Sequence, residues 1–168
     1  MDNEKPIYIG NDHGGYLLKK AILKYLDEKG IAWVDMGCDS TSIVRYPYYA
    51  ARVAGAVSRK EADRGILICS TGIGMSMLAN RFRGVRASLC TDTYMARMTR
   101  AHNDSNVLCL GGRVIGDLEA LDILKTWLET SYEGGRHAIS LGLIEEAEEI
   151  LCQAMVPAQE QIFRDFNR

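Results

Sequence analysis

Short apolar runs alternate with amphipathic stretches along most of this 168-residue chain. The runs are rich in β-favouring residues and end in glycine-rich or polar loops, whereas the stretches between them carry apolar side chains at helical spacing. The pattern predicts five strands, at 7–10, 31–36, 63–69, 85–89 and 107–110. It predicts a helix after each of them, at 16–29, 46–57, 73–80, 93–101 and 118–128.

Strands that alternate with single helices imply right-handed crossovers and a parallel sheet covered on both faces. We therefore predict an α/β fold in which residues 1–140 form one doubly wound, Rossmann-like domain around a five-stranded parallel sheet. Two further helical segments, 141–150 and 159–166, are predicted on either side of Pro157. We expect residues 141–168 to be a helical C-terminal extension of the same domain.

Composition and charge exclude several classes of function. The net charge of −2 leaves no basic footprint for nucleic acid, and no run approaches the roughly 18 apolar residues of a membrane span. The polar N-terminus lacks the apolar core of a signal peptide, so we expect a cytoplasmic protein. Its five scattered cysteines then predict reduced thiols, with no disulfide framework and no cysteine zinc site: Cys38, Cys69, Cys90, Cys109 and Cys152.

One apolar run, residues 65–69, stops abruptly in a glycine-rich loop with Cys69 at the junction. The loop and the helix start that follows it direct several N–H groups at one point, which favours a bound anion or a thiolate. An inert buried thiol is the alternative interpretation, and it is the one that we apply to the other four cysteines.

Known phosphate and nucleotide loops do not match this stretch. A cysteine phosphatase loop needs arginine six positions after the cysteine, where this chain has Met75. The Gly-Lys-Ser/Thr end of a nucleoside triphosphate loop is absent. Gly72 and Gly74 make only half of a dinucleotide fingerprint, and they follow the third strand instead of the first.

The three histidines of the chain each have a polar neighbour in sequence. His13 follows Asp12, while His102 precedes Asn103 and His137 follows Arg136. This arrangement predicts an acid–base and anion-binding set, although any one of the three could be an idle surface side chain.

Several separate blocks, in order and in register, resemble the type B ribose-5-phosphate isomerase family and its relatives that act on galactose and allose phosphates. Together they span about residues 7 to 140. The blocks are residues 9–15, 46–47, 65–76, 102–106, 111–116 and 133–137.

The resemblance implies an aldose–ketose isomerase that interconverts ribose 5-phosphate and ribulose 5-phosphate through a cis-enediolate, with no metal and no cofactor. It makes Cys69 the base and Thr71 a proton relay between the sugar oxygens. It makes the loop N–H groups an oxyanion hole, from Ser70 through Gly72, Ile73 and Gly74.

The resemblance also implies residues for ring opening and for binding. His102 would open the furanose ring with Asp12 and Tyr46 close by, and Asn103 would hold a sugar hydroxyl. The phosphate would be bound by His13, Arg113, Arg136 and His137. Family members are dimers or pairs of dimers with sites shared between subunits, so the last three residues would come from the partner of a homodimer or tetramer.

Two positions depart from the family pattern. Ser140 stands where an arginine is usual, and Arg45 stands where an acidic residue is frequent. We therefore expect Arg45 to take part in anion binding or to alter the preferred sugar length. Ribose 5-phosphate is the default substrate, and galactose 6-phosphate, allose 6-phosphate and a four-carbon sugar phosphate are alternatives.

Two other classes of function stay open at this point. A regulatory protein could keep the fold and bind sugar phosphate without turnover, as Ser140 suggests, although such a protein would not need Cys69, Thr71 and His102 together. A redox thiol protein would need a resolving cysteine, and none is close to Cys69 in sequence.

Overall fold

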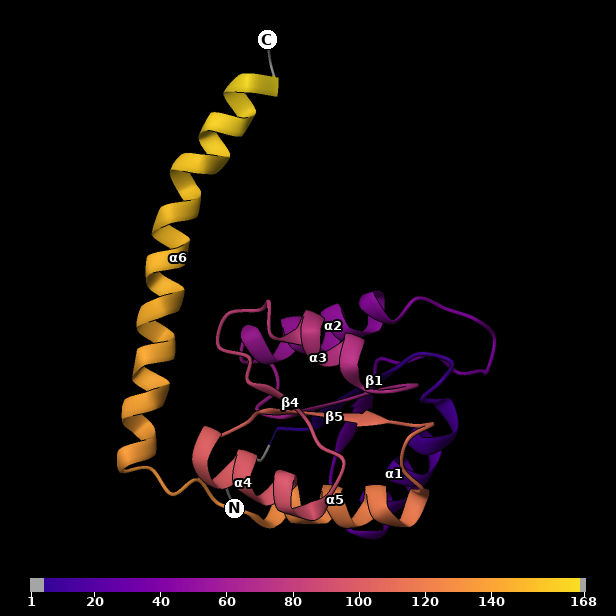
Figure 1. Cartoon of the computed structure of the whole chain (residues 1–168). Helices are drawn as coiled ribbons and strands as arrows, with labels where there is room; N and C mark the ends of the chain where they lie inside the picture. Colours follow the sequence, from indigo (N-terminus) through magenta and orange to yellow (C-terminus); the bar gives the residue numbers. More distant parts are fainter. Residues whose placement is uncertain (1–4, 167–168) are drawn as a thin grey trace. The chain divides into compact units, whose positions relative to one another are not determined.

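The computed structural model describes the main chain of residues 5–166 and the side chains of residues 5–151 (Figure 1). Every strand and helix predicted up to residue 128 is present. In chain order the elements are β1 (Ile7–Asn11), α1 (Tyr16–Glu28), β2 (Trp33–Asp35), α2 (Tyr46–Ser58), β3 (Gly65–Cys69), α3 (Ile73–Ala79), β4 (Ala87–Leu89), α4 (Thr93–Asn103), β5 (Val107–Gly111), α5 (Asp117–Glu129) and α6 (Arg136–Phe166).

Local chemistry explains where the helices begin and end. The α1 helix ends before Gly30, whose φ of 66° lies in the left-handed region that glycine adopts without strain. Asp92 caps the start of α4, where its side chain accepts the N–H of Met95 over 2.8 Å. Pro47 lies in the first turn of α2, where its missing N–H removes no helical hydrogen bond.

The five strands form one parallel sheet in the order β2-β1-β3-β5-β4. Ile66 of β3 lies beside Ile9 of β1 on one side and beside Leu108 of β5 on the other. The two strands adjoining β1 and β5 at the sheet edges are short and half-buried, at 33–35 and 87–89. They are shorter than the predicted runs 31–36 and 85–89.

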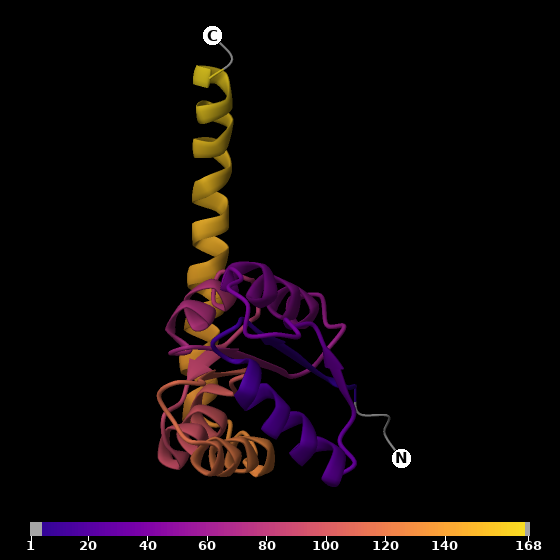
Figure 2. The same cartoon turned by 90° about the vertical axis from the view of Figure 1, so that its right-hand side faces the viewer.

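Helices cover both faces of the sheet (Figures 1 and 2). One apolar core lies under α1, α4 and α5 and is centred on Ile66, Leu108 and the fully buried Trp127. A second core lies under α2 and α3 and includes Met75 and Cys69. The doubly wound α/β fold predicted from the sequence is therefore confirmed.

The C-terminal segment differs from the prediction in one respect. The structure has a single helix, α6, that runs through Pro157, where two segments were expected. The chain divides into two compact units, residues 1–132 and residues 133–168. Within the described part of the chain, no helix has both the length and the apolarity that a membrane crossing requires.

Candidate active site

The crevice between β1 and β3 lies where the strand order changes direction. From β1 the chain moves to one side of the sheet, and from β3 it moves to the other, so the loops after these strands diverge and leave a crevice. Asp12 follows β1, and its N–H donates to Ile68 O over 3.1 Å, one residue before Cys69. The tertiary fold thus places the Asp12 and Cys69 loops side by side.

Glycines allow three loops of this edge to touch main chain to main chain. A Cβ on Gly14 would lie 2.9 Å from the N atom of Ser70, and a Cβ on Gly112 would lie 2.7 Å from the O atom of Gly14. The N–H groups of Gly112 and Arg113 donate to Cys69 O and Ser70 O over 2.8 and 3.0 Å. A side chain at either glycine would push these loops apart.

Cys69 is the last residue of β3, at the carboxyl edge of the sheet, and 6% of its surface is exposed. Its Sγ accepts the N–H of Gly72 over 3.1 Å. Gly72 has a φ of 77° and directly precedes α3, so this left-handed residue turns its N–H back toward the thiol. The next N–H, of Ile73, donates to Thr71 Oγ1 over 3.3 Å. Loop donors therefore point at a sulfur and at a hydroxyl.

Asp12 and His13 are held by backbone groups. Asp12 Oδ1 accepts the N–H of Gly14 over 2.8 Å, and the residue is 6% exposed. His13 Nδ1 accepts the N–H of Val44 over 3.3 Å and lies 4.0 Å from Asp12 Oδ2. Because the shorter of these contacts needs an unprotonated Nδ1, the neutral ring carries its proton on Nε2.

A pocket of about 490 Å³ opens beside these loops. Asp12 and His13 line it, together with residues 43–48 from the loop before α2 and its first turn. The Tyr46 ring lies against Gly74, where a Cβ would be 2.8 Å from Tyr46 Cζ. Tyr46 thereby connects the pocket to the Cys69 loop.

The neighbouring thiols have environments that suppress ionisation. Burial, followed by the negative charge of Asp92, raises the pKa of Cys90 to about 12. Burial raises the pKa of Cys109 further, with smaller effects from Cys69 and Cys90. A thiol that stays protonated is a poor resolving cysteine, which weakens the redox alternative. Cys38 is also buried, and Cys152 lies outside the described side chains.

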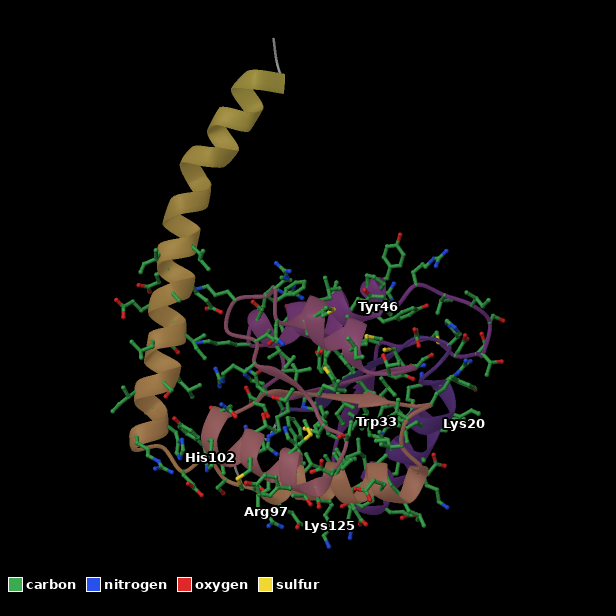
Figure 3. All side chains as sticks on the ribbon, in the orientation of Figure 1. Lys20, Trp33, Tyr46, Arg97, His102 and Lys125 are labelled. Atoms are coloured by element: carbon green, nitrogen blue, oxygen red, sulfur yellow. The ribbon has the colours of Figure 1, made fainter. Side chains whose placement is uncertain are left out.

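His102 and Asn103 lie away from this crevice. They end α4 just before β5 begins, at the amino edge of the sheet, whereas Cys69 lies at the carboxyl edge. In Figure 3, Tyr46 lies above the sheet and His102 lies below it, and the two side chains do not meet. The expected closeness of His102 to Asp12 and Tyr46 is therefore not met within one chain.

The cationic candidates fall into two groups. The main chain of Arg113 adjoins Ser70 of the same chain, through the hydrogen bond described above. Arg136 and His137 begin α6 in the second compact unit, where His137 Nε2 lies 3.7 Å from Glu133 Oε2.

Sequence reasoning missed two residues that organise the site. The Val44 N–H sets the His13 tautomer, and buried Asn11 donates from Nδ2 to Asp12 O over 2.9 Å and to Cys38 Sγ over 3.2 Å. The side chain of Val44 carries no signal, because its backbone acts. Asn11 could have been suspected as an amide at the end of an apolar strand.

Comparison with known proteins gives one consistent result. A sequence profile of the Ribose/Galactose Isomerase family matches residues 7–144. Ribose-5-phosphate isomerase B of Escherichia coli is 48% identical over 133 residues, which are 79% of this chain and 89% of that protein.

Solved structures agree with this match. Ribose-5-phosphate isomerase B of Clostridium thermocellum superposes with a TM-score of 0.85 at 49% identity, over 87% of this chain and 99% of that one. The Mycoplasma genitalium enzyme with bound ribulose-5-phosphate superposes with a TM-score of 0.82 at 38% identity, over 86% of this chain and 96% of that one.

Proposed function

The chain belongs to the ribose/galactose isomerase family and is a sugar-phosphate isomerase, and we propose that it interconverts ribose 5-phosphate and ribulose 5-phosphate. The names of its relatives support this choice of substrate. The single observation that carries the mechanism is the 3.1 Å hydrogen bond from Gly72 N–H to Cys69 Sγ, at the crevice between β1 and β3. A donor aimed at the sulfur stabilises a thiolate there.

Cys69 acts as the base of the isomerisation. Its thiolate takes the proton from C2 of the open-chain aldose, the electron pair of the broken C–H bond forms a C1–C2 double bond, and the carbonyl oxygen becomes an oxyanion. The same thiol then returns the proton to C1, and the oxygen on C2 becomes the ketose carbonyl. One general base of this kind accelerates proton transfer by about 10²- to 10⁴-fold.

Loop donors stabilise the enediolate between these two steps. The N–H of Gly72 points at the thiol, and the N–H groups of residues 70–74 supply the oxyanion hole, in which one donor lowers a barrier by about 3 kcal/mol. Thr71 Oγ1 already accepts the N–H of Ile73, so its own hydrogen is available to a substrate oxygen. Thr71 therefore moves the proton between the two sugar oxygens.

Ring opening requires a second copy of the chain. His102 and Asn103 lie at the amino edge of the sheet, opposite Cys69, so one chain does not bring them to the crevice. In a homodimer that shares its sites, His102 of one copy opens the ring held by Asp12 and Tyr46 of the other. Asn103 of the first copy then holds a sugar hydroxyl, and the phosphate is bound by His13 of the second copy together with Arg113, Arg136 and His137 of the first.

Turnover of defined sugars tests this function. The full chain is incubated with ribose 5-phosphate, allose 6-phosphate and galactose 6-phosphate without added metal, and ketose is measured. We expect ketose from ribose 5-phosphate and a loss of about 10²- to 10⁴-fold in kcat for Cys69→Ala. Cys90→Ala, which removes a buried thiol at the end of β4, is the matched control. A protein that forms no ketose from any of the three sugars contradicts the proposal.

A further inference from the structure

The pocket beside the crevice has two walls of different chemistry. Asp12 and His13 form one, and residues 43–48 form the other with apolar and aromatic side chains around Arg45. Its charged or titratable side chains are thus the Asp12 carboxylate, the His13 imidazole, the Arg45 guanidinium and the phenols of Tyr46 and Tyr48. Asp12 Oδ1 accepts the Gly14 N–H, and the imidazole and the guanidinium are the side-chain N–H donors that the pocket offers to a ligand.

Arg45 has no partner in the described part of the chain. Its side chain is exposed and takes part in none of the ion pairs or hydrogen bonds among residues 5–151. Some other arginines are paired: Arg59 contacts Glu61, while Arg86 and Arg100 both contact Asp104. A guanidinium that lines a pocket and uses none of its five N–H donors within the described chain can direct them at a bound anion.

His13 is fixed in a form that complements Arg45. Because Val44 N–H occupies Nδ1, the ring presents Nε2–H as its remaining donor. Val44 and Arg45 are adjacent, so the same segment sets the histidine tautomer and carries the cation. Arg45 is also the N-cap of the 13-residue helix α2, whose first turn contains no acidic side chain. The positive end of the helix dipole thus lies beside the guanidinium, and no acidic side chain of that turn offsets the two.

From this geometry we propose that Arg45 binds the substrate phosphate together with Nε2–H of His13, so that the loop 43–48 is a phosphate site of the chain itself. This inference rests on the proposed function, because it takes the pocket ligand to be a sugar phosphate. The phosphate then lies in the pocket and the reacting carbons lie at Cys69, with the Tyr46 ring between the pocket and Gly74. Arg45 would hold two phosphate oxygens with parallel N–H donors, which lysine cannot reproduce.

Three variants test the proposal. Arg45→Ala removes the guanidinium, Arg45→Lys keeps only the charge, and Arg97→Ala removes an exposed arginine of α4 outside the pocket (Figure 3). The measured quantities are KM and kcat for ribose 5-phosphate, the Ki of inorganic phosphate as a competitive inhibitor, and the Kd of inorganic phosphate by calorimetry.

We expect Arg45→Ala to raise KM, Ki and Kd together by about 10- to 100-fold, as the loss of charge-assisted hydrogen bonds requires, with kcat changed by less than about 3-fold. Arg45→Lys should recover part of the loss, and Arg97→Ala should match the wild type. Equal phosphate Ki and Kd for Arg45→Ala and the wild type overturn the proposal.

The two proposals fail separately. If the wild type converts ribose 5-phosphate while Arg45→Ala binds phosphate as well as it does, only the role of Arg45 is wrong. If the wild type converts no aldose phosphate, the proposed function is wrong, and the calorimetric Kd of inorganic phosphate still decides whether Arg45 binds that anion.

Discussion

The main-chain N–H of Gly72 donates a hydrogen bond to Sγ of Cys69 over 3.1 Å. The orientation of that N–H depends on a left-handed backbone, with φ of 77° at Gly72. The hydrogen bond to the thiol therefore depends on a backbone conformation that favours glycine.

Replacing Gly72 by alanine should damage both stability and catalysis. A Cβ there would lie 2.5 Å from Leu89 Cδ1 and 3.0 Å from Leu110 O, in addition to its left-handed strain. We expect a loss of about 2–4 kcal/mol in the free energy of unfolding and a lower kcat. Urea denaturation and the isomerase assay measure the two effects.

Gly84→Ala is the control for backbone strain alone. Gly84 has a φ of 73°, and an added Cβ would meet nothing within 4 Å. It should cost only about 1–2 kcal/mol. A loss for Gly72→Ala that is no larger than this would show that contacts with Leu89 and Leu110 contribute nothing.

The proposed ring-opening role of His102 predicts a dependence on the sugar. Ribose 5-phosphate exists mainly as a furanose, whereas erythrose 4-phosphate cannot close that ring, because its phosphate occupies O4. His102→Gln should therefore lower kcat/KM for ribose 5-phosphate by about 10²-fold or more and leave any turnover of erythrose 4-phosphate nearly unchanged. An equal loss for both sugars would mean that His102 acts in the proton transfer or in folding.

A mixing experiment tests whether sites are shared between copies. Cys69→Ala and His102→Gln are each expected to be impaired with ribose 5-phosphate. After the two are unfolded together and refolded, half of the dimers should be mixed, and each mixed dimer should contain one intact site. Activity should then recover to about a quarter of the wild-type level, as expected for a two-fold symmetric dimer.

The control for this experiment is each variant refolded alone, which should recover nothing. If the mixture is no more active than its parents, Cys69 and His102 do not meet across a subunit interface, and the dimeric site is wrong.

The buried thiols Cys90 and Cys109 predict a loss of stability at high pH. Both have a folded-state pKa above the ordinary value of 9.0, mainly through burial. Between about pH 9 and about pH 12 the unfolded chain releases these protons and the folded chain retains them. Each thiol should then lower the free energy of unfolding by about 1.4 kcal/mol per pH unit, while below about pH 8 neither has an effect.

Urea denaturation across this range, on the wild type and on the double variant Cys90→Ala/Cys109→Ala, measures the difference. The double variant should be less stable at neutral pH, because it leaves cavities, but it should show the shallower slope. Tyr25, whose pKa is raised mainly by burial and next by Glu129, remains in both proteins and cancels from the comparison. Identical slopes would contradict the assignment to the thiols.

The amino-acid sequence by itself determined the strand and helix alternation and the strand–loop–helix junction at Cys69. Such features are local, because the spacing of apolar residues along one element indicates which of its faces is buried. Gly72 and Gly30 mark left-handed positions that other residues rarely adopt. The motif blocks could likewise be recognised in the sequence, and they indicated the family.

Only the tertiary structure decided which of these loops meet. Strand order β2-β1-β3-β5-β4 is set by the packing of whole faces and by pairings distant in sequence, and it places Asp12 beside Cys69. The same order leaves His102 at the opposite edge. The Val44–His13 hydrogen bond, which joins residues 31 positions apart, was equally invisible. Apolar periodicity records local burial, whereas contacts between loops depend on where complete elements lie in the folded core.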